Sequence, residues 1–357
     1  MTKKLVVCSD GTWNSPDQPI PSNAAKLKQA LLKTDSNGIE QRLFYDPGIG
    51  VESNFIKKYV GGATGWGISE NIRDCYEFLM NNYASDDEIY CFGFSRGAYT
   101  VRSLIGFVTS FGLLNKQDRE LFNHNFDMIY KLYRIKPQKR PLHKNYEKVE
   151  QLKSRTVKPR CKLVGVWDTI GALGAPTPLM GWISRQLWVG FHDTELRNTD
   201  YAYHALAIDE RREPFRPSVW TSTQDDCQEM RQVWFAGSHT NVGGGYRYPG
   251  LADTTFLWMI KMARLRGLEF DQAYLDDPRN TNPDYRDQIN DSFSPPYWIF
   301  GPYLRPIGQL HEDVEEDRRG INEMLHASVV KRNAENLPTF NAGNLARGLE
   351  KLPVEPD

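Results

Sequence analysis

The stretch CFGFSRGAYT, residues 91–100, decides which fold we expect for this chain. It begins as the end of a buried strand, passes through a serine flanked by glycines, and continues as a helix. Residues 93–97 fit the pattern G-x-S-x-G, in which a serine occupies a sharp turn between a strand and a helix. Side chains at the two glycine positions would collide in so tight a turn. The pattern predicts that Ser95 is a nucleophile, and the alternative is a plain strand-to-helix turn.

Strand-like and helix-like segments alternate around this turn. Short apolar runs predict parallel strands buried on both faces at residues 4–10, 42–50, 88–95, 162–169 and 232–239. Helices are predicted at residues 23–34, 67–83, 97–114 and 118–135. This order predicts an α/β fold, specifically an α/β-hydrolase-like, doubly wound and mostly parallel sheet with helical insertions.

The whole chain, residues 1–357, is expected to form a single domain. Its core is predicted at about residues 4–260, with insertions at about 136–160 and 171–191. The loop-rich segment from about 275 to 357 is expected to wrap around this core.

Composition excludes several classes of protein. Lys and Arg number 44 and Asp and Glu 45, so a net charge of -1 offers no global attraction to nucleic acid. The five cysteines are scattered and lack any C-x-x-C spacing, which argues against a disulfide framework and a structural zinc site. The chain shows no signal peptide and no apolar run of membrane-spanning length. We therefore expect a cytoplasmic protein, which would leave the cell only by a signal-independent route.

A serine nucleophile requires a base and an acid that orients the base, and parallel sheets place such groups at the carboxyl ends of their strands. His239 closes a predicted strand and is the expected general base, although it could instead be a structural imidazole. Asp168 ends the strand before it and is the expected acid, unless it only caps the next turn. The competing carboxylates for the acid are Asp193, Asp200 and Asp209.

Acyl transfer also requires hydrogen-bond donors for the oxyanion. The backbone N–H of Arg96 is the first candidate, and the amides of Gly11 and Thr12 in SDGTWN (residues 9–14) are the second. An apolar strand followed by DGT also occurs in phosphatases that use an aspartyl nucleophile. That nucleophile would stand two positions before Asp10, where this chain has Cys8, so the phosphatase interpretation loses its central residue.

A set of motifs resembles a known family. They are VVCSDGTWN, DPGIG, GGATGWGISENI, GFSRGAYTVRSL, VGVWDTIGALG, HALAIDERREPFRP and WFAGSHTNVGGGY, in order over residues 4–260. Together they resemble the α/β-hydrolase domain of the first group of type VI secretion lipase effectors. The resemblance implies a Ser-Asp-His hydrolase, with Ser95 and His239 as nucleophile and base and with either Asp168 or Asp209 as acid. The chain departs from many relatives at Asn241, where they carry Asp.

An apolar segment follows the strand that ends at Asp168. Residues 175–191 contain few charges and include Trp182, Ile183, Leu187 and Trp188. Two interpretations stand side by side: a lid or acyl-chain wall that also touches a lipid surface, or a helix packed in the core.

We therefore predict a serine esterase that needs no cofactor and cleaves carboxylic esters, with lipid or phospholipid acyl esters as the expected substrates. Peripheral contact with a membrane is part of this expectation, and the oligomeric state is left open. One alternative is a non-catalytic member of the fold that binds a lipid or a protein. A weaker alternative is a metal-dependent phosphoesterase with Asp10, Asp46 and His239 as ligands.

Overall fold

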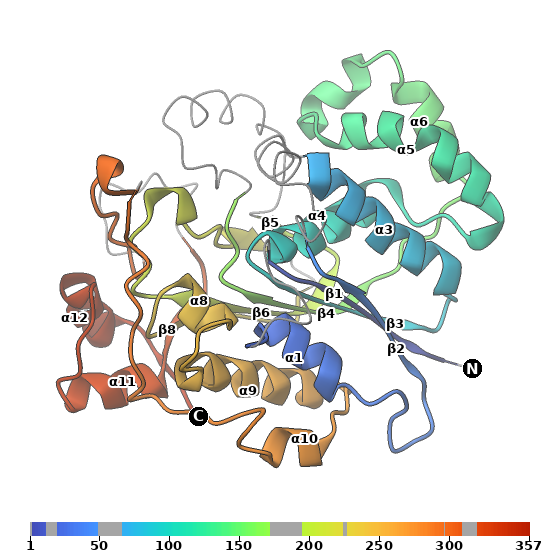
Figure 1. Cartoon of the computed structure of the whole chain (residues 1–357). Helices are drawn as coiled ribbons and strands as arrows, with labels where there is room; N and C mark the ends of the chain where they lie inside the picture. Colours follow the sequence, from blue (N-terminus) through green and yellow to red (C-terminus); the bar gives the residue numbers. More distant parts are fainter. Residues whose placement is uncertain are drawn as a thin grey trace.

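The computed structural model of the chain describes residues 2–11, 20–48, 66–171, 195–223, 227–295, 297–308 and 320–357. Within these residues the architecture is an α/β fold built on an eight-stranded sheet in which every neighbouring pair of strands is parallel. Helices cover both faces of this sheet (Figure 1). The α/β class and the parallel sheet are as the sequence predicts.

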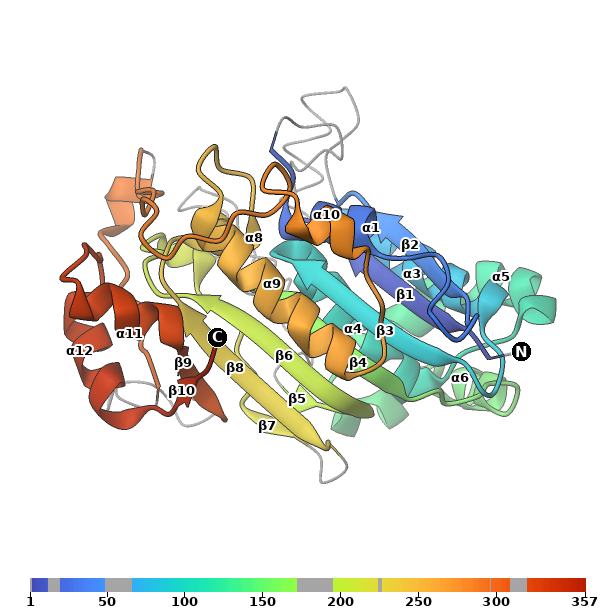
Figure 2. The ribbon, with the colours of Figure 1, turned by 90° about the horizontal axis from the view of Figure 1, so that it is seen from below.

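The strands are ordered β2-β1-β3-β4-β6-β8-β9-β10 across the sheet, a sequence that Figure 2 shows from below. Their bounds are β1 (Lys4–Ser9), β2 (Gln41–Asp46), β3 (Glu88–Phe94), β4 (Cys161–Trp167), β6 (Thr199–Ala207), β8 (Glu229–Phe235), β9 (Glu323–His326) and β10 (Val354–Glu355). A separate two-stranded ribbon pairs β5 (Glu195–Leu196) with β7 (Ser222–Thr223). The strand order reverses between β1 and β3, and in open α/β sheets the crevice at such a reversal is where ligands bind.

Two helical layers bury the apolar faces of the sheet. One layer contains α3 (Trp66–Asn82) and α4 (Arg96–Phe111), with α5 (Arg119–Tyr133) and α6 (Tyr146–Lys153) packed outside them. The other layer contains α1 (Asn23–Ala30), α9 (Gly250–Leu265) and α10 (Gln272–Asp276). Each layer has its own cluster of buried side chains against the sheet, so the central strands are covered on both sides.

The structure contains elements that the sequence patterns do not predict. The strand β6 lies between β4 and β8, and β9 and β10 extend the same sheet from within the segment expected to be a loop-rich tail. That segment also contains α11 (Ala327–Ala334) and α12 (Ala342–Lys351), which pack with the edge strands around a third apolar cluster. In the predicted insertion at 136–160 the chain forms a 3-10 turn, η2 (Pro137–Leu142), and α6. The predicted insertion at 171–191 lies outside the described residues beyond residue 171.

Candidate active site

Ser95 lies in a strained turn between β3 and α4. Its backbone has φ 58° and ψ −120°, a left-handed conformation that is rare for residues other than glycine. A Cβ at Gly93 would lie 2.6 Å from the backbone nitrogen of Ala98, and one at Gly97 would overlap the backbone carbonyl of Ser9. Both flanking glycines are therefore required by the close approach of α4 to β3 and β1. A strained non-glycine residue costs about 1–3 kcal/mol, which the surrounding packing must offset.

Three side chains from different strand ends form a continuous hydrogen-bonded series. Ser95 Oγ lies 2.8 Å from His239 Nε2, and His239 Nδ1 lies 2.6 Å from Asp168 Oδ2. A carboxylate only accepts hydrogen bonds, so Nδ1 carries the proton and Nε2 is left to accept one from the serine. All three residues are buried, with exposed fractions of 6%, 4% and 0% for Ser95, His239 and Asp168.

His239 is the first residue of the short helix α8 (His239–Gly243), directly after β8. Its ring is held between two aromatic rings, Phe94 at 4.7 Å and Phe215 at 5.2 Å between centroids. Burial lowers the pKa of His239, and although Asp168 works in the opposite direction, the net shift is downward. The imidazole is therefore neutral near pH 7, which is the form that accepts a proton.

Asp168 follows β4 in a left-handed backbone conformation, with φ 39°. Burial alone would raise the pKa of its carboxyl, but Arg305 and His239 outweigh this effect and hold the pKa well below its usual range. Arg305 binds both carboxylate oxygens, at 2.5 Å from Nη1 to Oδ1 and 2.9 Å from Nη2 to Oδ2. The backbone N–H of Ala207, at the end of β6, donates a further hydrogen bond to Oδ1 at 3.0 Å. Asp168 is thus an ionised carboxylate in a buried setting.

The competing carboxylates have other partners. Asp209 accepts hydrogen bonds from the amide of Gly237 at 2.7 Å, the hydroxyl of Thr339 at 2.5 Å and the amide of Phe340 at 2.7 Å. Asp200 forms an ion pair with Arg160 at the other end of β6. Asp193 lies outside the described residues. Of the described candidates for the acid, Asp168 is the one whose carboxylate contacts His239.

The predicted oxyanion donors are only partly described. Arg96 is the first residue of α4, so its backbone N–H has no acceptor within the helix and lies at the positive end of the helix dipole. The amide of Gly11 donates to the Asp10 carboxylate at 2.6 Å and is occupied in this arrangement. Thr12 lies outside the described residues. The proposed lid residues Trp182, Ile183, Leu187 and Trp188 also lie outside them.

The residues of the metal hypothesis are not grouped around a common point. Asp10 also accepts hydrogen bonds from Ser22 and Tyr45, while Asp46 accepts them from Ser9 Oγ, the Gly48 amide and Asn71. Both ring nitrogens of His239 are engaged by Ser95 and Asp168. Within the described ranges, no group of three or more His, Cys, Asp or Glu residues is arranged to hold a metal ion. The geometry therefore does not favour the phosphoesterase hypothesis.

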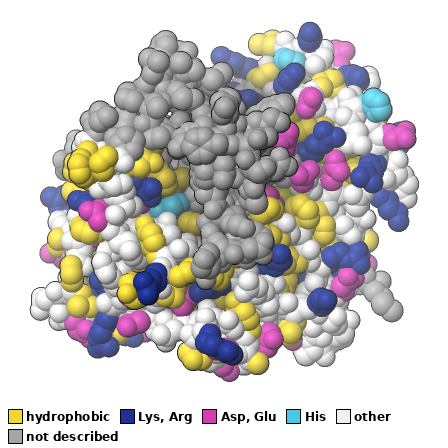
Figure 3. Space-filling model, viewed as in Figure 1, with side chains coloured by type: hydrophobic (Ala, Val, Ile, Leu, Met, Phe, Trp, Pro, Cys, Tyr) yellow, Lys and Arg dark blue, Asp and Glu magenta, His cyan; other side chains and the backbone are white. Residues whose placement is uncertain are grey.

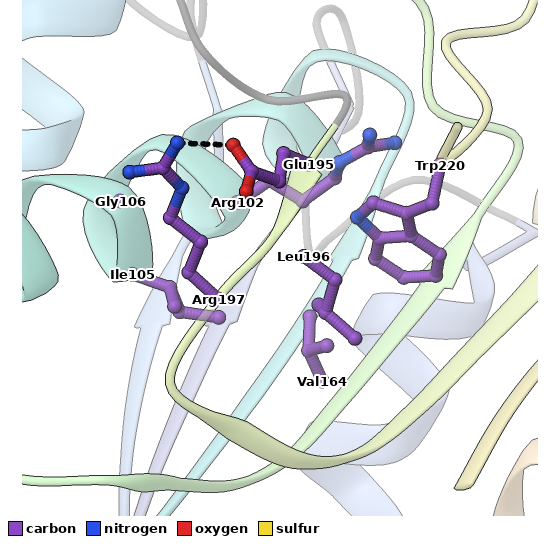
Figure 4. A pocket seen from close by; sticks show the side chains of 8 residues that line it. All are labelled: Arg102, Ile105, Gly106, Val164, Glu195, Leu196, Arg197 and Trp220. Carbon is purple, nitrogen blue, oxygen red and sulfur yellow. Dashed lines mark hydrogen bonds and ion pairs between the residues drawn. The ribbon is translucent and has the colours of Figure 1, made fainter. Parts of the chain in front are cut away.

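A pocket on the α4 side of the sheet contains none of the three residues of the hydrogen-bonded series (Figure 4). The Arg102 guanidinium lies over the Trp220 ring, and Arg197 forms an ion pair with Glu195 at its edge. Trp220 also packs against His204, whose Nε2 accepts a hydrogen bond from the amide of Thr169, the residue after Asp168. Trp220, which lines this pocket, is therefore linked through His204 to the residue that follows Asp168.

Comparison with known proteins identifies a family that most of the chain matches. Residues 3–262 match the family described as the catalytic domain of Tle1-like phospholipase effectors of the type VI secretion system. The chain belongs to this family. Ser95, Asp168 and His239 all lie within the residues matched to this family.

More distant similarities accompany this Tle1-like match. An uncharacterized protein of Saccharomyces cerevisiae is 27% identical over 237 residues, which cover 61% of this chain and 33% of the yeast protein. A crystal structure of an uncharacterized Pseudomonas aeruginosa protein is 14% identical with a TM-score of 0.44, covering 80% of this chain and 49% of that one. A structure of the Tle1 effector bound to the VgrG spike is 17% identical with a TM-score of 0.36, covering 69% and 52%. The chain spans a third of the yeast relative and about half of each solved chain.

Sequence patterns did not point to Arg305, and within the loop after β6 they pointed to Asp209 but not to Glu210, Arg212 or Phe215. Glu210 in this loop accepts a hydrogen bond from the backbone N–H of His239 at 3.2 Å and is paired with Arg212. The Arg212 guanidinium lies 3.5 Å from the ring centroid of Phe215, which in turn contacts His239. The motif HALAIDERREPFRP marks this loop, but not which of its residues reach the histidine.

Proposed function

We propose that this Tle1-like chain is a serine hydrolase that cleaves carboxylic esters of lipids, with Ser95 as nucleophile, His239 as general base and Asp168 as the orienting acid. The observation that carries this proposal is the hydrogen-bonded series from Ser95 Oγ through His239 to Asp168, formed at a strained G-x-S-x-G turn. Neither feature alone is specific to catalysis. Their combination matches what nucleophilic attack by a serine requires.

The reaction follows from the positions of the protons. Ser95 Oγ attacks the ester carbonyl carbon while its proton passes to His239 Nε2, and the Asp168 carboxylate stabilises the imidazolium that forms. The Arg96 N–H at the start of α4 donates to the oxyanion of the tetrahedral intermediate. His239 then returns the proton to the departing alkoxide, which leaves an acyl-enzyme on Ser95. Water, deprotonated by His239, attacks the acyl carbonyl, and collapse of the second intermediate releases the fatty acid and restores Ser95.

Apolar and aromatic groups beside His239 support a lipid substrate. Phe94 and Phe215 line the histidine, and Tyr297 packs edge-on against Phe215 with centroids 6.1 Å apart. Tyr297 belongs to η4 (Tyr297–Phe300), and its neighbour Trp298 is 62% exposed. Hydrophobic side chains gather where Figure 1 draws this segment, at the upper left of the face in Figure 3. An exposed tryptophan that follows a ring packed against Phe215 suits contact with a lipid surface.

The test is hydrolysis of a phospholipid in vesicles and of a short soluble ester by the wild type and two matched variants. Ser95→Ala removes the nucleophile and is expected to lower kcat by at least about 1,000-fold on both substrates. Ser103→Ala makes the same change within α4, at a buried hydroxyl that has no hydrogen-bond partner among the described residues. It should retain wild-type activity. Equal hydrolysis by Ser95→Ala and Ser103→Ala would refute the proposed function and favour a binding protein.

A further inference from the structure

The C-terminal part of the chain, beyond the family-matched residues 3–262, contributes a side chain to the candidate site. Arg305 has no exposed surface, and its guanidinium binds both oxygens of Asp168 in the two-pronged geometry that favours arginine over lysine. Its Nη2 lies 2.9 Å from Oδ2, the same oxygen that accepts the hydrogen bond from His239 Nδ1. Arg305 and His239 therefore share one carboxylate oxygen.

The backbone around Arg305 is fixed by the last helix. The side chains of Asn341 and Asn344, at the start of α12, donate to the Arg305 carbonyl at 2.9 and 3.0 Å. The guanidinium also donates to the carbonyls of Ala207 at 2.9 Å and Phe215 at 2.6 Å. One side chain thus joins the C-terminal helix, the end of β6 and the turn that places Phe215 against His239.

We propose that Arg305 is a positioning residue of the active site, which orients the Asp168 carboxylate and limits its pull on the His239 proton. This inference rests on the proposed function, because it assigns Arg305 a role through Asp168 and His239. Arg305 and His239 bind the same oxygen of Asp168, Oδ2. The positive charge of the arginine therefore weakens the electrostatic attraction between this oxygen and a protonated His239. The histidine then stays neutral at rest and is free to take the serine proton.

Two other charged residues also influence the pKa of His239. Glu210 favours the imidazolium and Arg212 opposes it, and these two residues are paired with each other. Asp168 is the strongest group that favours the imidazolium, and Arg305 is the cation bound to it. Removing the Arg305 charge should therefore raise the pKa of His239, while removing a distant arginine should not.

The experiment compares Arg305→Gln, Arg305→Lys and the control Arg231→Gln. Arg231 also ties the C-terminal segment to the sheet, through Glu355 at 2.7 and 2.8 Å, but is not among the partners of the Ser95–His239–Asp168 series. For a short soluble ester, Arg305→Gln is expected to lower kcat on the order of 100-fold with KM within about twofold, because the histidine loses its alignment. It should also move the acid limb of the pH profile to higher pH.

Arg305→Lys separates charge from geometry. It should restore the position of the acid limb but only part of kcat, since an ammonium cannot bind both carboxylate oxygens in the same fork. Arg231→Gln should match the wild type in kcat and pH profile. A folded Arg305→Gln protein with wild-type kcat and acid limb would overturn the inference. If Arg305→Gln does not fold, Arg305→Lys with full wild-type kcat would overturn it instead.

A second readout does not depend on catalysis. The titration of the His239 ring is followed by NMR in the Ser95→Ala background, with and without each Arg305 and Arg231 change. A rise in the His239 pKa on Arg305→Gln, absent with Arg231→Gln, supports the positioning role even if Ser95→Ala proves fully active and the proposed function fails. An unchanged His239 titration would refute the positioning role whatever the activity.

Discussion

Asp168 is a buried carboxylate held from two sides, by an ion pair with Arg305 on one and by a hydrogen bond from the His239 ring on the other. Burial of an unpaired carboxylate would favour the protonated form, which cannot stabilise an imidazolium. Arg305 and His239 both lower the pKa of this carboxyl, so either partner helps to keep it ionised. The site therefore depends on residues 137 positions apart in the sequence.

Separate substitution of the two candidate acids, Asp168 and Asp209, tests which of them orients His239. Asp168→Asn should lower kcat about 10,000-fold, because an amide cannot hold the His239 ring in the tautomer that accepts the serine proton. Asp209→Asn should leave kcat of the folded protein close to wild type and instead lower the melting temperature, because Asp209 accepts three hydrogen bonds that close the loop before α8. Steady-state kinetics below the melting temperature of each variant make the comparison. The reverse pattern would assign the acid to Asp209.

The pH dependence follows from the state of His239. The base works only when neutral, and the folded protein lowers the pKa of this histidine, so activity should persist below the ordinary histidine value of about 6.5. Below the lowered pKa, kcat/KM should fall about tenfold for each pH unit, since one proton inactivates the base. A profile of kcat/KM from pH 4.5 to 8 measures this. An acid limb with its midpoint above about pH 7 would show that Asp168 outweighs burial.

Sequence reasoning reached the residues at strand ends but not those that support them. Ser95, Asp168 and His239 each follow an apolar run, so their positions in a parallel sheet could be predicted, and the structure brings them within hydrogen-bonding distance. Arg305 lies in an irregular segment whose contact with Asp168 depends on how the last helix folds back. No local pattern indicates such a contact.

The turn between β3 and α4 is the element on which the site is built. The α4 helix begins at Arg96, directly after the strained serine, and its first turn lies against the ends of β1 and β3. This packing leaves no room for side chains at the two glycines of the turn. The helix thereby supplies both the position of Ser95 and a positive N-terminus beside it.

Substitution of Gly97, the second glycine of the turn, tests whether the close packing of α4 against β1 excludes a side chain there. In Gly97→Ala the new methyl group would overlap the Ser9 carbonyl, so α4 must move and the free energy of unfolding should fall by about 1–3 kcal/mol. Gly343→Ala in α12 is the matched control, because nothing lies within 4 Å of the added Cβ. It should be neutral or slightly stabilising, since alanine favours helix over glycine. Chemical denaturation measures both, and equal stability of the two variants would contradict the packing argument.

The strand β6 shows why apolar runs in the sequence do not predict every strand of the sheet. Its sequence TDYAYHALA includes Asp200 and His204, so it does not read as a continuous apolar run even though it lies in the middle of the sheet. Hydrogen bonds satisfy these groups: His204 accepts from the Thr169 amide, and Asp200 pairs with Arg160. The strands β9 and β10 are only four and two residues long, too short to show a periodicity.

The whole molecule combines residues 3–262, which match the Tle1-like family, with a C-terminal segment whose strands join the same sheet. This segment contributes β9, β10 and the aromatic η4 region. In the parts of the chain that the structure describes, no helix has both the length and the apolar character needed to span a bilayer. The proposed function assigns contact with a lipid surface to exposed apolar side chains such as Trp298.

A comparison of two exposed apolar residues tests this contact. Trp298→Ala should lower hydrolysis of vesicle phospholipid several-fold and leave hydrolysis of a short soluble ester unchanged, because only the first substrate requires binding to a surface. Leu265→Ala is the control. Leu265 is 61% exposed at the end of α9 and lies close in sequence to Gly267, whose carbonyl accepts a hydrogen bond from Lys4 at the amino end of β1. Equal loss on both substrates in Trp298→Ala would indicate damage to the site instead of to surface binding.

The most direct measurement of the central claim is covalent labelling of the purified protein with a fluorophosphonate, read by intact mass and by the modified peptide. The account predicts one adduct per chain on Ser95, no adduct in Ser95→Ala, and strongly slowed labelling in His239→Gln, because the probe reports a serine activated by its base. A folded wild-type protein that takes up no label, or that is labelled at another serine, would contradict it.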